Sequence, residues 1–171
     1  MIIIKYISTF LIFIICSAIG ILYSKKYSNR VKELEEIKNA LNIFKSKIKF
    51  TYEPIPEVFK QISTQLHSNI GTIFLKASNY MKNDIAGEAW EKSIDEEKNN
   101  INLTNDDTEI IKKLSKMLGN TDLDGQLNNI ELINRFLDKQ IVEAEREEEK
   151  NEKLYKTLGA SIGLTIAIIL F

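Results

Sequence analysis

Both ends of the chain are apolar, and almost every charge lies between them. One uncharged stretch of eighteen residues runs from Tyr6 to Tyr23, and a second of fifteen runs from Thr157 to Phe171. All 24 acidic residues and all but one of the 23 basic residues lie between these stretches. A helix rises about 1.5 Å per residue and the hydrocarbon core of a bilayer is about 30 Å thick, so an apolar run of about 18 residues can cross it. The sequence therefore predicts a charged domain held between two membrane spans, as in a hairpin.

The first apolar stretch is interpreted as a retained anchor, with a cleaved signal peptide as the alternative. It is longer than the apolar core of most signal peptides, only Lys5 precedes it among the basic residues, and no clear A-x-A cleavage site follows it. Cys16 is the single cysteine, so a disulfide within the chain is excluded, and Ile15 before it does not suit a lipoprotein signal. We therefore expect residues 1–23 to remain as a transmembrane helix.

The second apolar stretch, residues 157–171, is predicted to form a short C-terminal transmembrane helix. Fifteen residues cover only about 22 Å, so Tyr155 and Lys156 would lie at the interface or the bilayer would thin locally. The alternative is an apolar helix that packs on the domain. Basic residues gather on the domain side of both stretches: Lys25, Lys26, Arg30 and Lys32 after the first, and Arg146, Lys150, Lys153 and Lys156 before the second. The positive-inside rule then places the domain in the cytoplasm and both termini across the membrane.

Residues 24–156 are predicted to form one cytoplasmic domain that is long enough for a core of its own. The chain has a formal charge of −1, and leaving out Lys5 gives −2 for the domain, so net charge does not indicate a nucleic-acid-binding protein. One histidine and the absence of CxxC and HExxH motifs leave little for a metal site.

The domain has a helical period nearly throughout, and its predicted fold is all-α, a six-helix bundle. Apolar residues recur every three or four positions from Val31 to Ile48, on a helix that continues straight from the first span. No stretch alternates with a period of two, so no strand is predicted. An even number of helices also returns the chain to the side it left, as two flanking spans require. The other five predicted helices carry their apolar stripes at 58–66, 73–80, 86–94, 110–117 and 123–141.

Several residues are assigned to the ends of these helices. Pro54 and Pro56 should end the first helix, with Pro56 in the first turn of the second. The segment 69–71, which contains an asparagine and a glycine, should end the second helix. Thr121 should cap the sixth helix, with Asp124 as its partner in a capping box.

No group of residues forms an enzyme signature, and no cofactor is expected. His67 has no nucleophile or carboxylate partner that the sequence indicates, so it is interpreted as a surface or helix-end histidine. The acidic residues Glu145, Glu147, Glu148 and Glu149 provide oxygen ligands for a cation, but they lack the loop of a calcium site and are interpreted as a solvated helix face. The chain has no Gly-rich phosphate loop and no nucleophile motif, which argues against an esterase or a protease.

Two further features bear on contacts with the membrane and with other helices. Gly159 and Gly163 form a GxxxG pattern, which is either a close-packing face or a pair of ordinary membrane glycines. The segment from Lys25 to Lys49 carries eight basic and three acidic residues. It can pair with anionic lipid headgroups or with the acidic end of the sixth helix, although positive-inside anchoring alone also explains it.

Four motifs occur in an order that resembles a known family. They are Pro-Ile-Pro-Glu at 54–57, Trp90 in the fourth predicted helix, Leu-Gly-Asn-Thr-Asp at 118–122 followed by Gln126, and the segment 150–159 directly before the terminal span. Together they resemble the stage III sporulation protein AB family, over essentially the whole chain. The segment 150–159 is the most specific motif, because it joins a charged helix end to a short membrane exit.

The resemblance implies more than the periodicity does. It implies a six-helix cytoplasmic domain like those of type II secretion and type IV pilus inner-membrane platform proteins. It also implies a non-catalytic role in the channel apparatus between mother cell and forespore, in the mother-cell membrane around the forespore. The domain would dock a secretion-type ATPase and support other membrane components, and a homo-oligomer is compatible with this role.

Three exposed surfaces are expected to bind such a partner: the Pro-Ile-Pro turn (Pro54, Pro56 and Glu57), the turn before the sixth helix (Thr121 and Asp122) and the acidic juxtamembrane end (Glu147 and Glu148). Each set also has a purely structural interpretation as a turn, a cap or a solvated face. The alternative function is a membrane-tethered sensor or regulator that binds a small ligand or lipid in its bundle. It would need a cavity with convergent polar groups, which the apolar stripes do not indicate.

Overall fold

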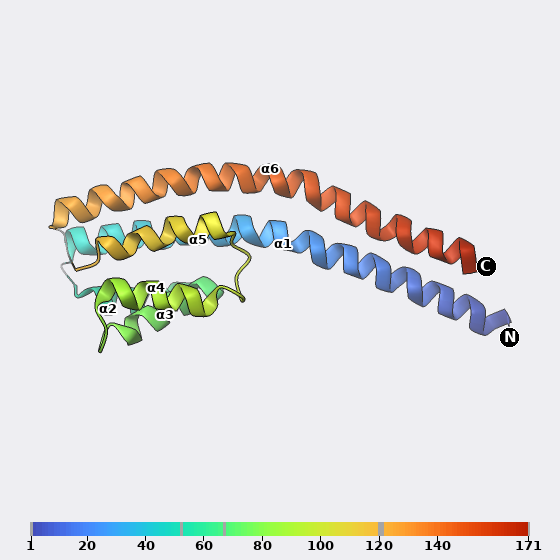
Figure 1. Ribbon diagram of the computed structural model, residues 1–171, viewed down its shortest axis with the longest axis horizontal. Helices are drawn as coiled ribbons and strands as arrows, with labels where there is room; N and C mark the ends of the chain where they lie inside the picture. The colour runs from blue at the N-terminus through green and yellow to red at the C-terminus, as the bar shows by residue number, and fades with distance from the viewer. Residues whose placement is uncertain (1, 52, 67, 120–121, 171) are drawn as a thin grey trace. The chain divides into compact units, whose positions relative to one another are not determined.

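The structure is a computed structural model that describes residues 2–51, 53–66, 68–119 and 122–170. His67 and Thr121 lie outside these residues, so their predicted roles as a surface histidine and a helix cap remain predictions. The described residues contain no strand, which confirms the all-α prediction for them. Figure 1 shows the helices, which are α1 (Ile2–Phe50), α2 (Ile55–Gln65), α3 (Asn69–Tyr80), α4 (Ala86–Glu97), α5 (Asn105–Lys112), the short 3-10 helix η1 (Lys113–Lys116) and α6 (Leu123–Leu170).

The chain divides into two compact units. We call the residues up to Val31 and from Glu143 onward the terminal unit, and Lys32–Val142 the central unit. Helices α1 and α6 contribute to both, with 49 and 48 residues respectively. The predicted continuation of the first apolar stretch into the first helix of the domain is therefore confirmed.

The core of the central unit is built around aromatic rings from four helices. Phe44 of α1, Phe59 of α2, Phe74 of α3 and Trp90 of α4 are all buried. The ring of Phe59 lies 5.2 Å from Phe44, 5.1 Å from Phe74 and 5.5 Å from Trp90 between centroids, each time edge to face. This geometry brings the positive edge of one ring to the negative face of the next. Trp90 also donates from Nε1 to the carbonyl of Ile111, over 2.8 Å, and so attaches α5 to the same cluster.

Within the central unit, α1 and α6 run antiparallel. Asn134 of α6 donates to the side-chain oxygen of Asn42 over 2.8 Å, and Lys45 pairs with Glu131 at 3.3 Å. The residue numbers of these contacts rise along α1 and fall along α6. The end of α1 and the beginning of α6 therefore lie at the same end of the unit (Figure 1). The turn that leads into α2 starts there too.

One predicted helix end is wrong. The segment 69–71 does not end a helix, because α2 already stops at Gln65 and α3 begins at Asn69. Ser68 caps α3 by accepting a hydrogen bond from the backbone N–H of Ile70 over 3.0 Å. Gly71 is buried in the first turn of α3, where a Cβ atom would lie 2.9 Å from the carbonyl oxygen of Leu66. The glycine therefore serves close packing at the turn.

Candidate membrane anchor and interaction surfaces

The Pro-Ile-Pro turn presents part of its predicted surface to solvent. Pro54 precedes α2, and Pro54 and Glu57 are exposed. Pro56 is half-buried, and its carbonyl accepts a hydrogen bond from the Ser78 hydroxyl over 2.8 Å. Pro56 thus fastens α2 to α3, whereas Pro54 and Glu57 are free to contact another molecule.

Asp122 is exposed and caps α6. Its Oδ1 accepts a hydrogen bond from the backbone N–H of Gly125 over 3.0 Å, and α6 begins at Leu123. Asp122 thus supplies a capping acceptor at this helix end, and the cap predicted for Thr121 stays a prediction because Thr121 lies outside the described residues. A carboxylate here also complements the positive end of the helix dipole. Asp122 belongs to the same end of the central unit as the start of α2.

The predicted acidic docking residues belong to the terminal unit, whereas the two turns belong to the central unit. The carboxylate of Glu147 accepts a hydrogen bond from Arg30 of α1 over 2.7 Å, and the side chain of Arg30 is only 6% exposed while that of Glu147 is 43% exposed. The sequence indicates two partners for the basic segment 25–49, anionic lipid headgroups and the acidic end of the sixth helix. This ion pair is of the second kind. Glu148 is half-buried. The predicted docking residues are thus divided between the two units.

A close glycine contact joins α1 and α6 in the terminal unit. A Cβ atom on Gly20 would lie 2.6 Å from the carbonyl oxygen of Tyr155, and one on Gly159 would lie 2.9 Å from the carbonyl oxygen of Cys16. Both distances are shorter than any ordinary contact of a Cβ atom, so only glycine lets the two backbones approach this closely. Gly163 is buried as well. The packing interpretation of the GxxxG pattern therefore holds for Gly159.

Sequence reasoning missed Gly20, the partner of Gly159. The available signal was a second small-xxx-small pattern, formed by Cys16 and Gly20 in the first apolar stretch. Because the sequence does not say which small residue meets which, the contact follows only from the structure. A pocket of about 310 Å³ adjoins it and is lined by Cys16, Ile19 and Ile162, among others.

Three tyrosines stack next to the glycine contact, on the side that leads to the charged residues of both helices. The ring of Tyr155 lies 6.1 Å from that of Tyr23 and 5.8 Å from that of Tyr27, nearly parallel to both. Aromatic side chains with a polar tip are typical of the boundary between membrane and water. The stack therefore marks the level at which the terminal unit changes from apolar to polar.

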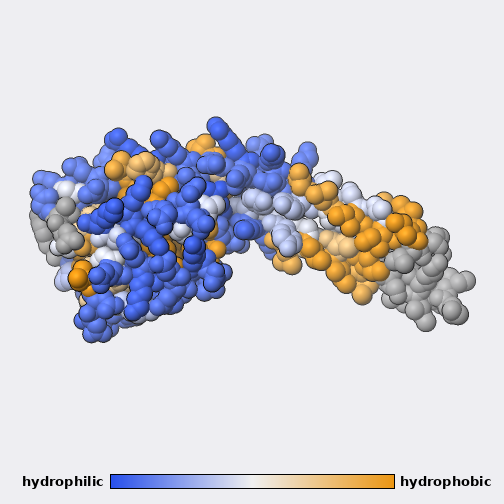
Figure 2. Space-filling view, viewed as in Figure 1, coloured by the Kyte–Doolittle hydropathy of each residue, from blue (hydrophilic) through white to orange (hydrophobic). Residues whose placement is uncertain are grey.

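The exterior of the terminal unit is apolar beyond this level. Figure 2 shows hydrophobic residues on the visible face of this helix pair. By length and composition, α1 is the one helix among the described residues that qualifies as a membrane span. Its exposed apolar side chains include Phe10, Leu11, Ile14, Ile15, Ile19 and Leu22. On α6 the exposed ones include Leu158, Ile162, Leu164, Ile168 and Ile169.

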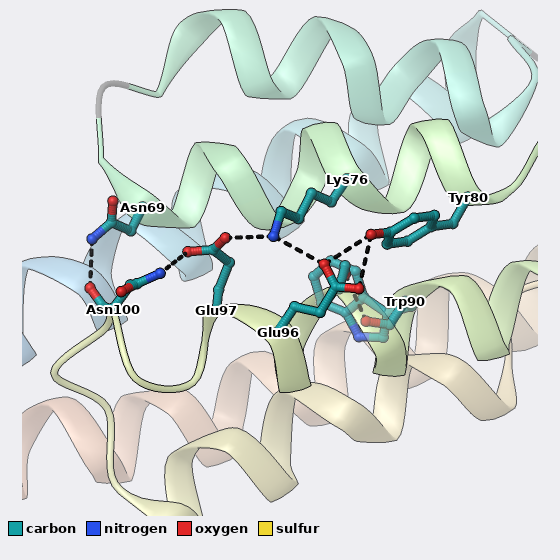
Figure 3. A network of polar contacts seen from close by, with 8 residues as sticks. Asn69, Lys76, Tyr80, Trp90, Glu96, Glu97 and Asn100 are labelled. Carbon is teal, nitrogen blue, oxygen red and sulfur yellow. Dashed lines mark hydrogen bonds and ion pairs between the residues drawn. The ribbon is translucent and has the colours of Figure 1, made fainter.

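The central unit holds an ion-pair network between α3 and α4, shown in Figure 3. The ammonium of Lys76 lies 2.8 Å from Glu97 and 2.9 Å from Glu96, and the Tyr80 hydroxyl donates to Glu96 as well. The hydrogen bonds to Glu97 and Glu96 raise the pKa of Lys76, and the hydrogen bond from Lys76 lowers the pKa of both carboxyls. Asn100 adds a second hydrogen bond to Glu97. Each charge has a partner, which indicates a role in holding the helices together.

A second polar contact fixes the loop between α4 and α5 to α1. The buried carboxylate of Glu33 accepts hydrogen bonds from the backbone N–H of Asn102 at 2.6 Å and from its side chain at 2.8 Å. Burial raises the pKa of Glu33, although both hydrogen bonds act in the opposite direction. In the part of the chain that the structure describes, no group of three or more His, Cys, Asp or Glu side chains is placed to hold a metal ion.

The fold and the surfaces define the chain as an all-helical protein with a candidate membrane helix near its N-terminus. Residues 5–171 match the family described as stage III sporulation protein AB, so the chain belongs to this family. It is 28% identical over 153 residues to the stage III sporulation protein AB of Bacillus subtilis (strain 168), across 88% of this chain and 90% of that protein. A solved structure of a stage III sporulation protein AB has the same fold, with a TM-score of 0.68 at 24% identity, covering 71% of this chain and 98% of that one. The chain is thus a sporulation protein, as its motifs suggested.

Proposed function

We propose that this protein is a non-catalytic membrane platform of the sporulation channel between mother cell and forespore. Both α1 and the end of α6 cross the mother-cell membrane that surrounds the forespore, and the domain between them faces the mother-cell cytoplasm. The domain docks a secretion-type ATPase and supports the assembly of other channel components. This proposal extends the family membership, which supports a role in sporulation and leaves the partner open.

The observation that carries the proposal is the inverted packing of the terminal unit. A helix pair in water hides its large apolar side chains and exposes small or polar ones. Here glycines occupy the contact between the helices, while leucine and isoleucine side chains face outward on both. This pattern suits lipid, where close backbone packing and not apolar burial drives helix association. It supports a second membrane span in α6 even though that apolar stretch is short.

The polar residues of the terminal unit support the proposed orientation. The Arg30–Glu147 ion pair and the tyrosine stack lie on the side of the glycine contact that leads toward the charged residues. Lys25 and Lys26 are exposed on the same side of the apolar stretch of α1. Basic residues next to a membrane span favour the cytoplasmic side. We therefore place the charged part of the chain in the cytoplasm.

Labelling from each side of the membrane tests this topology. Cys16 is first replaced by serine, and single cysteines are placed near residue 2 and near residue 171 in two separate variants. A membrane-impermeant maleimide added from the cytoplasmic side should label neither. Labelling of the C-terminal cysteine from that side would exclude the hairpin topology.

Co-purification tests the partner. The full chain, solubilised in a mild detergent, should retain the secretion-type ATPase of the same organism. Reversing the charge of an exposed residue on the docking surface should weaken this binding. Glu57→Lys on the Pro-Ile-Pro turn is such a variant, and Glu109→Lys on the exposed side of α5 is a matched control. If the ATPase does not co-purify from membranes in which the chain is inserted, the docking proposal is wrong. The proposed membrane anchor is not affected by this result.

A further inference from the structure

A basic stripe lies on α6 directly before its uncharged end. Arg146, Lys150 and Lys153 are exposed, and their spacing of four and three residues puts them on one face of the helix. They line a surface pocket of about 580 Å³ together with two leucines, Leu154 and Leu158. The pocket is therefore cationic at one end and apolar at the other.

This stripe is not used by the contact between α1 and α6. With 3.6 residues per turn, Lys150 and Lys153 point between a third and a half of a turn away from Tyr155 and Gly159, which pack against α1. The basic side chains therefore face outward from the helix pair. Glu149 also lines the pocket, so its three basic groups and one carboxylate leave a net positive charge.

The order of the residues along α6 matches the order of chemical groups in a phospholipid. Lys150 and Lys153 come first, Leu154 and Leu158 follow, and the uncharged stretch begins at Thr157. An anionic headgroup lies at the membrane surface with its acyl chains below it. Basic residues near such a surface attract anionic lipids. Their alkyl stems can also lie along apolar surface while their charged ends reach the phosphate level.

We infer that this face of α6 is a binding site for one anionic phospholipid. Arg146, Lys150 and Lys153 bind its phosphate, and Leu154 and Leu158 contact its acyl chains. The inference rests on the proposed membrane anchor, since only an inserted α6 meets lipid at this level. The site would hold a lipid at the point where the charged part of α6 enters the bilayer.

The two lysines that follow the first apolar stretch provide a matched control. Lys25 and Lys26 are exposed, carry the same charge and lie in the same unit. Being adjacent, they point about 100° apart around α1 and do not share a face. They attract anionic lipid in general but do not form a site with α6.

The experiment compares two double variants of the full chain. The wild type, K150Q/K153Q and K25Q/K26Q are purified in a mild detergent and titrated with phosphatidylglycerol or with phosphatidylcholine, and lipid adducts are counted by native mass spectrometry. Each basic residue near anionic lipid changes binding about fivefold, so the loss in K150Q/K153Q should reach about thirtyfold for phosphatidylglycerol. K25Q/K26Q should lose clearly less, because Lys25 and Lys26 attract anionic lipid without lining the pocket, and phosphatidylcholine should bind all three proteins alike.

The outcomes separate this site from general attraction and from failure of the anchor. An equal loss in both double variants, or no loss in K150Q/K153Q, overturns the site. If sn-glycerol 3-phosphate competes as well as the whole lipid, the site recognises a free phosphate group and the inference is wrong. Extraction of the wild-type chain from membranes by alkaline carbonate tests the anchor separately. Release of the chain would overturn the proposed function, whereas retention without a lysine-dependent preference overturns only the lipid site.

Discussion

Gly20 and Gly159 each occupy the space that a side chain on the other would need. A Cβ atom on Gly20 would lie 3.1 Å from the Cα atom of Gly159, and one on Gly159 would lie 3.0 Å from the Cα atom of Gly20. The contact is thus backbone against backbone on both helices. A larger residue at either position would meet backbone atoms of the opposite helix, which cannot move aside as a side chain can. This pair therefore sets the separation of α1 and α6 in the terminal unit.

A larger residue at position 159 should separate the two helices. In Gly159→Val the added methyl groups would meet the backbone at Cys16 and Gly20, and overpacking of this kind costs about 1–3 kcal/mol. The readout is disulfide formation between native Cys16 and Ile162→Cys, since both positions line one pocket. We expect crosslinking to fall severalfold in Gly159→Val.

The matched control is Ala160→Val, which adds bulk to an exposed neighbour on the same helix. Crosslinking should stay near the level of the parent protein with Ile162→Cys alone. An equal decrease in both valine variants would mean that the glycine contact does not set the helix separation.

Replacement by lysine should have different effects on helix packing at Glu147 and at Glu148. Glu147→Lys removes a partner from the buried guanidinium of Arg30 and places a second cation beside it. We expect the packing of α1 against α6 to lose about 1 kcal/mol of stability. The value is small because Glu147 is almost half exposed. The measurement is the same crosslink between Cys16 and Ile162→Cys.

Glu148→Lys is the cleaner test of an acidic docking surface, because the Arg30 pair stays intact. If this surface binds the ATPase, Glu148→Lys should reduce its co-purification severalfold while the crosslink remains unchanged. Glu109→Lys, on an exposed position of the central unit, is the control for charge alone. Unchanged ATPase retention in Glu148→Lys would remove the acidic end from the docking surface.

The helices were predictable because their determinants are local. The spacing of Val31, Leu34 and Ile37, repeated along the chain, defines one apolar stripe, and Pro54 stops the first helix whatever the tertiary structure. The unbroken course of α1 follows from the same period. Pro56, by contrast, was predicted for docking, and its half-buried contact with Ser78 depends on where α3 lies.

The contacts between distant segments were not predictable from one sequence. Nothing in the spacing of residues pairs Gly20 with Gly159 or Glu33 with Asn102, because each pair meets only after the helices pack. Gly71 shows the same limit at short range. Glycine favours both helix ends and close packing, and only the approach of Leu66 decides between them.

Truncation of Phe59 should destabilise the central unit more than any surface change on the same helices. Its ring contacts three other aromatic rings and is fully buried, so Phe59→Ala should lower the free energy of unfolding by about 3–5 kcal/mol. Leu75→Ala is the control, since Leu75 is exposed on α3. Urea denaturation of the full chain in detergent, followed by circular dichroism, measures both. Equal losses in the two variants would show that the aromatic cluster is not the centre of the core.

Glu33 should make the stability of the central unit depend on pH. Burial raises the pKa of its carboxyl above the ordinary value of 4.5, so the folded state favours the protonated form. The stability that this group contributes is therefore present below pH 4.5 and is lost as the pH rises through the raised pKa. Glu33→Gln removes the ionisation. Its amide can keep both contacts with Asn102 if the Asn102 side-chain amide turns over.

We therefore expect the difference in free energy of unfolding between Glu33→Gln and the wild type to shift in favour of the variant as the pH rises above 4.5, and then to level off. Urea denaturation at a series of pH values, followed by the fluorescence of buried Trp90, measures this difference. Glu35→Gln is the control, because Glu35 lies on the same helix and is exposed. A difference for Glu33→Gln that stays constant with pH would mean that Glu33 is ionised equally in the folded and unfolded chains. The Asn102 hydrogen bonds would then fully offset the cost of burying its charge.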